Sequence, residues 1–348
     1  MKKITFILGS MGRGGAERVI SILSDYYAQK GYQTDIIVLL KNEVGYRLHE
    51  TTRIIDFSGK TMSRLKRVPF WIKSIKKYVK ENKPDVIISF AARINVITLY
   101  ACKKLKTKII VSERNDPRLD GRTKLVDFMT NRLYPKADKV VFQTQRAKSY
   151  FKKLKNGLII PNPIRVPVFA EKVNVSKIVT VGRLTQQKNQ KMLISAFCDL
   201  AKKNPDAFLE IYGAGELEGE LKQQTQSLDL QDKIKFMGNR ENVLEMISDA
   251  SMFCLSSDYE GLSNALLEAM MMGIPCVSTK CAGADEYIID GENGFLVAVG
   301  DKENFAEKMT VLYNNVELQR QFSEKSKETA VAFSMEAVMK KWDEIVEG

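Results

Sequence analysis

Apolar residues gather in short runs along this chain, and longer amphipathic stretches separate these runs. Runs rich in β-branched residues predict strands at 4–8, 34–40, 86–90, 108–112, 139–143 and 158–160. The intervening stretches have helical spacing, most clearly at 16–30 and 64–83. Because these strands are apolar throughout and not alternating, we expect a parallel sheet covered by helices on both faces.

A cluster of prolines, Pro161, Pro163 and Pro167, interrupts this pattern, and the pattern then starts again. Strands are predicted at 177–181, 208–212, 233–236, 252–255, 276–278 and 294–297, with helices between them. Two such cycles predict an α/β protein of two doubly wound Rossmann-like domains, residues 1–165 and 166–332. We expect the C-terminal helix, 333–348, to pack back on the first domain. Ligands should bind at the carboxyl ends of the strands, in a cleft between the domains.

The net charge of the chain changes sign at the same place. The 348 residues have a net charge of +12, but residues 1–165 hold 35 Lys+Arg against 13 Asp+Glu, whereas residues 166–348 hold 19 against 29. A basic half joined to an acidic half argues against a protein that binds nucleic acid along its whole length. The single histidine, His49, leaves little material for histidine metal sites or catalytic triads.

The cysteines and the apolar runs indicate the compartment. Five cysteines without a C-x-x-C pair predict reduced thiols and a cytoplasmic location. We expect no signal peptide, because the first apolar run ends at Gly9 without a cleavage site. No apolar run approaches the ~18 residues of a membrane span.

The most informative segment is 256–270, where a polar loop follows a strand and a helix begins near Ser263 or Asn264. The free N–H groups of that helix start suit a diphosphate, and Gly261 allows the backbone close to it. Glu260 and Glu268 can both face one ligand, because helical side chains lean toward the N-terminus. Carboxylates repel phosphate, so we interpret them as acceptors for sugar and ribose hydroxyls. Taken singly, each would be an ordinary surface glutamate.

A second segment, 181–189, follows a strand and contains Gly182, Arg183 and Lys188. The planar guanidinium of Arg183 suits phosphate oxygens, and Lys188 supplies a point charge.

Together these segments resemble the family-4 retaining glycosyltransferases, which have the GT-B fold. Glu260 and Glu268, with Gly261-Leu262 after the first and Ala269-Met270 after the second, match the family's E-x7-E signature, and 182–189 matches its G-R-L-x-x-x-K-N segment. The resemblance implies transfer of a sugar from a nucleotide diphosphate donor, a UDP-sugar, with retention of anomeric configuration. It assigns catalytic roles to Arg183, Lys188 and Glu260.

The resemblance extends to further donor contacts. It implies that Glu268 holds the ribose and that loops of the second domain line the nucleotide pocket. The implied donor-binding residues are Gly14, Gly15, Gly182, Gly213, Gly215, Arg240, Val243, Gly261, Leu262, Ser263, Asn264 and Glu268. Plain turns and helix starts are the alternative for the glycine loops and for Arg240 and Val243.

The acceptor side departs from the family pattern. Many members carry a histidine in the loop after the strand at 108–112, whereas this chain has Glu113, Arg114 and Asn115 there. These three residues are the candidate acceptor contacts, and a capped turn is the alternative.

The stretch 64–83 predicts a basic amphipathic helix, with Trp71 on one side and Lys73, Lys76, Lys77 and Lys80 on the other. One interpretation is binding to an anionic membrane surface, for which Trp71 and the four lysines are candidates. The other is a helix packed on the core with a solvated lysine face.

We therefore expect a glycosyltransferase that uses no metal or other cofactor and acts on a polyprenyl-diphosphate-linked saccharide in bacterial polysaccharide biosynthesis. It would be cytoplasmic, at the inner face of the cell membrane, with no nucleic-acid partner. Two alternatives remain: a nucleotide-sugar epimerase on the same fold, and a non-catalytic protein that binds membrane surfaces.

Overall fold

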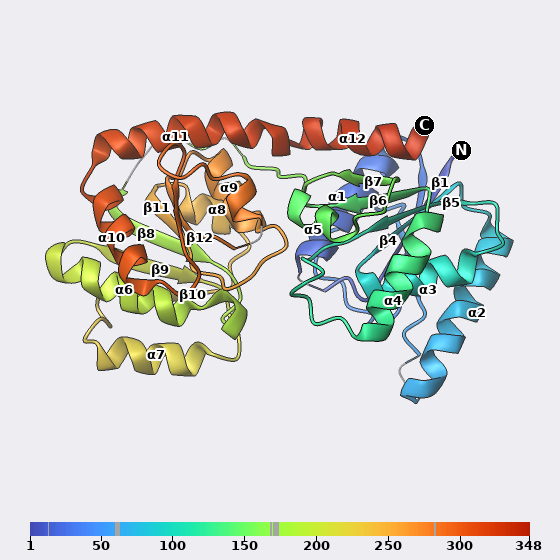
Figure 1. Cartoon of the computed structure of the whole chain (residues 1–348), viewed down its shortest axis with the longest axis horizontal. Coiled ribbons are helices and arrows are strands. Elements are labelled where there is room, and N and C mark those ends of the chain that lie inside the picture. Colours follow the sequence, from blue (N-terminus) through green and yellow to red (C-terminus); the bar gives the residue numbers. More distant parts are fainter. Residues whose placement is uncertain (13, 60–62, 168, 170–173, 282) are drawn as a thin grey trace. The chain divides into compact units, whose positions relative to one another are not determined.

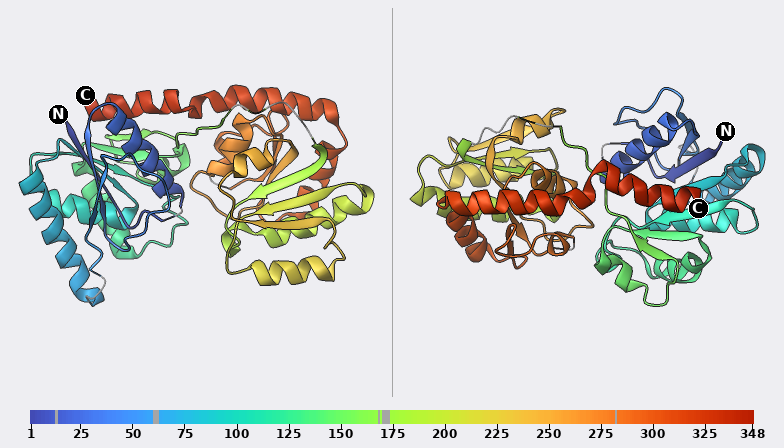
Figure 2. Two further views of the ribbon diagram at one scale, coloured as in Figure 1. Left: turned by 180° about the vertical axis from the view of Figure 1, so that it is seen from behind. Right: turned by 90° about the horizontal axis from the view of Figure 1, so that it is seen from above.

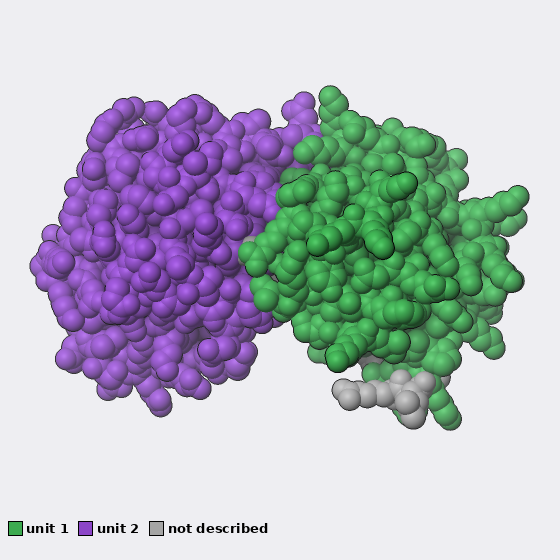
Figure 3. All heavy atoms as spheres, viewed as in Figure 1, with its two compact units in different colours: residues 1–163, 339–348 green, residues 164–338 purple. Residues whose placement is uncertain are grey.

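The computed structural model describes residues 1–12, 14–59, 63–167, 169, 174–281 and 283–348. Arg13, which directly precedes the predicted donor contacts Gly14 and Gly15, lies outside the described residues. The chain forms two compact units, coloured separately in Figure 3. Unit 1 comprises Met1–Pro163 and Met339–Gly348, and unit 2 comprises Ile164–Val338.

Unit 1 is built on a seven-stranded parallel sheet in the order β3-β2-β1-β4-β5-β6-β7 (Figure 1). Its strands are β1 (Lys3–Leu8), β2 (Gln33–Val38), β3 (Arg53–Asp56), β4 (Val86–Phe90), β5 (Lys108–Ser112), β6 (Lys139–Phe142) and β7 (Gly157–Ile159). The central strands are buried on both faces, as the unbroken apolar runs predict.

Helices cover both faces of this sheet. They are α1 (Gly15–Gln29), α2 (Arg64–Asn82), α3 (Ala92–Cys102), α4 (Lys124–Leu133), η1 (Tyr134–Lys136), α5 (Gln145–Tyr150) and, at the C-terminus, α12 (Met335–Glu347). Helices α2, α3 and α4 pack in that order on one face, and α1 lies on the other, at the front in the left view of Figure 2. Right-handed crossovers require this, because the chain moves in opposite directions along the sheet from β1 to β2 and from β3 to β6.

The C-terminal residues complete unit 1. Trp342 of α12 is fully buried, and its ring stacks at 6.5 Å from that of Phe90 in β4. Asp343 and Glu347 of the same helix accept hydrogen bonds from Lys30 at 3.0 and 2.8 Å.

Unit 2 contains a six-stranded parallel sheet in the order β10-β9-β8-β11-β12-β13. The strands are β8 (Asn174–Val181), β9 (Phe208–Tyr212), β10 (Ile234–Gly238), β11 (Ala250–Leu255), β12 (Cys276–Thr279) and β13 (Phe295–Val297). The helices are η2 (Gln186–Lys188), α6 (Gln190–Lys203), α7 (Glu218–Ser227), α8 (Val243–Ile247), α9 (Asn264–Met271), η3 (Ala284–Glu286), α10 (Lys302–Tyr313), α11 (Val316–Ala330) and η4 (Val331–Phe333). The strand orders of both units are those of doubly wound folds, which bind ligands at the carboxyl ends of their strands.

One sequence prediction fails in the core of unit 1. Trp71 is 6% exposed and donates its indole N–H to the carbonyl of Phe57 at 2.8 Å. It lies with Ile75 and Val79 in the cluster between α2 and the sheet. The predicted membrane contact of Trp71 is therefore wrong: the apolar side of α2 is occupied by the protein's own core.

Candidate functional site

The carboxyl ends of β8 and β11 carry the two segments that the sequence singled out, and hydrogen bonds join these segments. The Asp258 N–H donates to the Gln187 carbonyl at 2.9 Å, and the Asn189 amide donates to the Asp258 carboxylate at 2.8 Å. The hydroxyl of Ser256 donates to the Lys188 carbonyl at 2.9 Å. The loop after β8 is thereby held against the loop after β11.

This contact brings together two of the three predicted catalytic residues. The Lys188 ammonium forms an ion pair with the Glu260 carboxylate, across 72 positions of sequence. The side chains are 15% and 10% exposed, and Ser257 donates a second hydrogen bond to the same carboxylate oxygen at 2.8 Å. Burial and two donors hold Glu260 in one orientation, three residues before the N-cap of α9.

Arg183, the third predicted catalytic residue, lies nearby in the β8 loop but is used differently. Its side chain is exposed, and Gln190 bonds to its backbone carbonyl at 3.0 Å. An exposed guanidinium on an anchored backbone is accessible to an anionic ligand. Gly182 lies beside Lys188, because a Cβ at this glycine would stand 3.3 Å from Lys188 Cε.

Gly213 and Gly215 have a packing role that the sequence did not predict. A Cβ on Gly213, whose φ is +134°, would stand 1.9 Å from the Gly182 carbonyl oxygen, and one on Gly215 would stand 2.2 Å from that of Leu184. Only glycine allows the β9 loop to pack this closely on the β8 loop. Donor binding by these glycines stays a prediction.

Helix α9 begins as the sequence predicts. Ser263 is its N-cap, and its hydroxyl accepts from the Leu266 N–H at 3.4 Å. Leu262 and Glu268 are buried, at 7% and 3% exposure, and Asn264 is half-buried. Gly283 closes on Gly261, because a Cβ at Gly283 would stand 2.6 Å from the Gly261 carbonyl. The helix start, Glu260 and Lys188 thus form one continuous constellation.

Arg240 and Val243 lie beyond the carboxyl end of β10. Arg240 is exposed, and Val243, the first residue of α8, is half-buried. The structure brings them to the same edge of the sheet as Gly213, whose N–H donates to the Gly238 carbonyl at 2.9 Å.

In unit 1, Gly14 and Gly15 start α1 at the carboxyl end of β1. Gly14 is the N-cap and contributes no side chain, and its carbonyl accepts from the Tyr46 hydroxyl at 3.1 Å. A Cβ on Gly14 would stand 2.3 Å from a carboxylate oxygen of Glu17. Gly14 itself therefore contributes no capping side chain, and the Glu17 carboxylate lies beside this helix start.

Glu113, at the carboxyl end of β5, is engaged within unit 1. It is 2% exposed and accepts hydrogen bonds from Arg122, at 2.8 Å, and from the Tyr134 hydroxyl. Burial raises the pKa of Glu113, and the charge of Arg122 opposes this rise. The carboxylate holds the 113–122 loop in place.

Arg114, the next residue, has only uncharged groups as its described contacts. Its guanidinium donates to Ser112 Oγ at 3.1 Å and to Asn162 Oδ1, and it lies 4.7 Å from the centre of the Phe90 ring. Burial lowers the pKa of Arg114 to about 9, although the charge of Glu17 acts in the opposite direction. Nε has no hydrogen-bond partner among the described residues. Asn115 is exposed.

The structure also shows residues at the site that the sequence analysis missed. They are Ser257, which bonds to Glu260, Gln190, which holds the Arg183 loop, and Cys281, which follows β12. Burial, with the charge of Glu260, raises the pKa of Cys281 to about 12, so the thiol is neutral near the ion pair. No sequence signal marked these contacts in advance, because each joins residues that are far apart in the chain or that lie in loops without a recognisable spacing.

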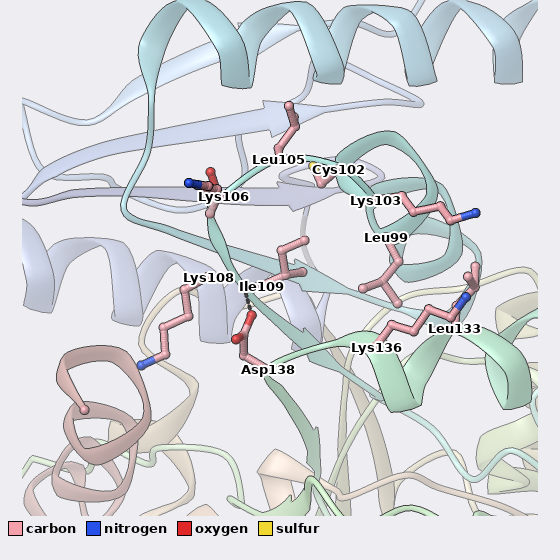
Figure 4. A pocket seen from close by; sticks show the side chains of 12 residues that line it. Leu99, Cys102, Lys103, Leu105, Lys106, Lys108, Ile109, Leu133, Lys136 and Asp138 are labelled. Atoms are coloured by element: carbon pink, nitrogen blue, oxygen red, sulfur yellow. Dashed lines mark hydrogen bonds between the residues drawn. The ribbon is translucent and has the colours of Figure 1, made fainter.

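A pocket of about 570 Å³ in unit 1 does not belong to this constellation. Lys108, Ile109 and Asp138 line it at the amino-terminal edge of the sheet, and Figure 4 shows Asp138 accepting from the Ile109 N–H, at 2.7 Å. The candidate residues lie at the opposite, carboxyl ends of the strands.

Metal-binding clusters and membrane-spanning helices are both absent from the described part of the chain. No group of three histidine, cysteine, aspartate or glutamate residues is placed to hold a metal ion there. Within the same residues, no helix has both the length and the apolar character needed to cross a membrane.

Comparison with known proteins identifies the class. Residues 13–166 match the family described as Glycosyltransferase Family 4, and residues 165–329 match Glycosyl transferases group 1. An uncharacterized glycosyltransferase of Haemophilus influenzae is 30% identical over 99% of this chain and 100% of its own length. The chain belongs to the family-4, group 1 glycosyltransferases.

More distant similarities agree with this assignment. An α-1,4-N-acetyl-D-galactosaminyltransferase of Campylobacter jejuni, whose name includes a PP-undecaprenol-linked saccharide, is 28% identical over 99% of this chain and 98% of its own. TarM of S. aureus, in a complex that includes UDP, superposes with a TM-score of 0.85 at 14% identity, and HepE of Anabaena with UDP at 0.81 and 17%; both match the whole of each chain. The fold is GT-B, and the protein is a glycosyltransferase.

Proposed function

We propose that this glycosyltransferase transfers a sugar from a UDP-sugar to a hydroxyl of a polyprenyl-diphosphate-linked saccharide in bacterial polysaccharide biosynthesis, with retention of anomeric configuration. The observation that carries the proposal is the pairing of Lys188 with Glu260 beside the start of α9. The named acceptor of the Campylobacter relative and the UDP bound by the structural neighbours support the choice of substrates.

In this proposal unit 2 binds the donor. Arg183, Lys188 and the N–H groups that begin α9 stabilise negative charge on the departing diphosphate, which is electrostatic catalysis that needs no metal. Glu260, oriented by Lys188 and Ser257, accepts hydrogen bonds from sugar hydroxyls. Glu268 accepts from the ribose, while Arg240 and Val243 contact the base.

Unit 1 binds the acceptor in this proposal. The start of α1 at Gly14 and Gly15 presents backbone N–H groups toward a phosphate, and the guanidinium of Arg114 follows β5 at the carboxyl ends of the strands of the same sheet. Asn115, exposed on the same loop, supplies a further hydrogen bond. Glu113 holds that loop through Arg122 and Tyr134.

The enzyme would work as a peripheral membrane protein at the cytoplasmic face. Lys73, Lys76, Lys77 and Lys80 are exposed on the outer side of α2 and would attract an anionic lipid surface.

The test is a titration with UDP followed by a donor screen. We expect the native chain to bind UDP in a calorimeter, and Lys188→Ala and Glu268→Ala to weaken binding, with the exposed Lys191→Ala as a matched control. Incubation with UDP-sugars and lipid-linked saccharides should then give an α-linked product. If the sugar is converted to its epimer and no glycosidic bond forms, the epimerase alternative is correct. Absence of UDP binding would disprove the donor site.

A further inference from the structure

Helix α4 has an outer face that is both apolar and basic. Leu125 and Phe128 are 69% and 62% exposed, which makes them the most exposed large apolar side chains after Met1 in the described part of unit 1. Lys124 and Arg132 are exposed beside them. Phe128 is four positions after Lys124, three after Leu125 and four before Arg132, so the four side chains lie on one side of the helix. We call them the α4 face.

Other residues of α4 make its contacts with the rest of unit 1. Thr130 and Leu133 are buried against unit 1. Asp127, the only acidic residue of α4, accepts a hydrogen bond from the Tyr150 hydroxyl at 2.7 Å and is half-buried. The α4 face therefore carries two cations and no carboxylate.

The neighbouring helices continue this surface. Because α2, α3 and α4 pack in order on one face of the sheet, their outer sides lie next to one another (Figures 1 and 2). The outer side of α3 has Arg93 and Tyr100, and the latter is 53% exposed. Beyond the ends of α3 and α4, Lys103 and Lys136 extend on the same side of their pocket (Figure 4).

We propose that the α4 face inserts into the head-group region of an anionic lipid bilayer. Exposed leucine and phenylalanine gain from leaving water, and lysine and arginine at the same depth pair with lipid phosphates. Lysines alone would hold the protein only by screened attraction, whereas apolar insertion adds a contact that salt does not weaken.

The position of the α4 face relates it to the acceptor loop. Helix α4 begins at its cap Thr123, directly after Arg122, whose guanidinium bonds to Glu113. Insertion of Leu125 and Phe128 would therefore hold the 113–122 loop at the membrane surface, where the phosphates of a lipid-linked acceptor lie. This inference deepens the proposed acceptor class, but the membrane contact itself depends on no sugar chemistry.

The test uses the full chain and vesicles of phosphatidylglycerol mixed with phosphatidylcholine. We expect Leu125→Ser/Phe128→Ser to lower the vesicle-bound to free ratio at least tenfold, while Val316→Ser, a 68% exposed valine of unit 2, leaves it unchanged. Tryptophan introduced as Phe128→Trp should be quenched by brominated lipid beyond the native signal, and Val316→Trp should not. Vesicle binding by the Leu125/Phe128 variant equal to that of the native chain would overturn the proposal.

Two further measurements separate the remaining outcomes. If sedimentation without lipid shows a dimer that the Leu125/Phe128 variant loses, the α4 face binds a second copy and not a membrane. UDP titration of the same variant should match the native chain, because its donor unit is unchanged. If the native chain does not bind UDP, the proposed function is refuted and the vesicle result still holds.

Discussion

In the proposed function, the chemistry of this site depends on Lys188 and Glu260. Each is nearly buried, and each neutralises the other. Because an ammonium group that stabilises a leaving diphosphate acts mainly in the transition state, its loss should affect the rate far more than substrate binding.

The first prediction concerns Lys188. Lys188→Ala should lower the transfer rate by about 100-fold to 1,000-fold, as for the loss of one donor in an oxyanion site. The measurement is kcat and KM with the donor found in the screen. Lys191→Ala should retain the native rate. A fall in rate that matches a fall in folded fraction, measured by circular dichroism, would show that the ion pair is only structural.

The second prediction concerns Gly213. Gly213→Ala should destabilise unit 2 by about 3 kcal/mol, because the new Cβ would overlap the Gly182 carbonyl and the backbone φ is +134°. The measurement is the urea midpoint. Gly219→Ala is the control, since a Cβ there meets no atom within 4 Å and alanine favours a helix. Equal midpoints for the two variants would contradict the close packing of the two loops.

At the scale of elements, helix α2 is tied to the sheet by a buried polar cluster. Asp35 of β2 is fully buried and receives hydrogen bonds from Arg53, at 2.7 and 2.8 Å, and from the Tyr78 hydroxyl of α2. Lys3 of β1 lies 3.2 Å from the same carboxylate. Burial alone would raise the pKa of Asp35, but these donors outweigh it and lower the pKa below its ordinary value of 3.8.

The third prediction follows from the direction of this pKa. A carboxyl group whose pKa is lower in the folded state stabilises the fold fully above its unfolded pKa, and this stabilisation is lost as the pH falls through the folded pKa. Protection of β2 amides from hydrogen exchange should therefore fall below about pH 4. In Asp35→Asn, protection should be weaker at pH 7 and change less on acidification. Exposed Asp206→Asn should behave as the native chain does.

Elements also show where sequence patterns were sufficient and where they were not. Buried strands such as β4 and β5 were predicted with their observed bounds. A short, unbroken run of apolar residues indicates a strand that is covered on both faces of a sheet. Strand β3, at the edge of the sheet, was missed: its two middle residues are half-buried, and the strand begins and ends with an exposed charged residue. Helix α11 was not predicted, since few apolar residues mark its buried side.

At the scale of the whole molecule, the division of charge follows the division of the chain into two units. The basic residues concentrate in the half that carries the proposed acceptor loop and the α4 face, and the acidic excess lies in the half that carries the proposed donor site. In the proposed function, unit 2 binds an anion through local groups, Lys188, Arg183 and a helix start, so its net charge is no obstacle.

The fourth prediction uses salt to separate these contributions. Raising the ionic strength from about 0.05 to 0.5 M should weaken the part of vesicle binding that depends on exposed lysines, because salt screens their charge, and should leave the apolar contact of Leu125 and Phe128 in place. The affinity for UDP should fall less, since Lys188 is largely buried. The measurements are vesicle sedimentation and calorimetry in the same buffers. Equal salt dependence of both would show that the net field, and not local groups, attracts the donor.

The sequence by itself determined what is local. It predicted two cycles of strand and helix, the helix start at Ser263 and the family signature, because each depends on residues close together in the chain. Only tertiary structure decided which side chains meet. It paired Lys188 with Glu260 across 72 positions, turned Trp71 inward, and left Leu125 and Phe128 in water. A periodic pattern shows that a helix has two sides, but the neighbours that the fold brings to it decide which side is covered.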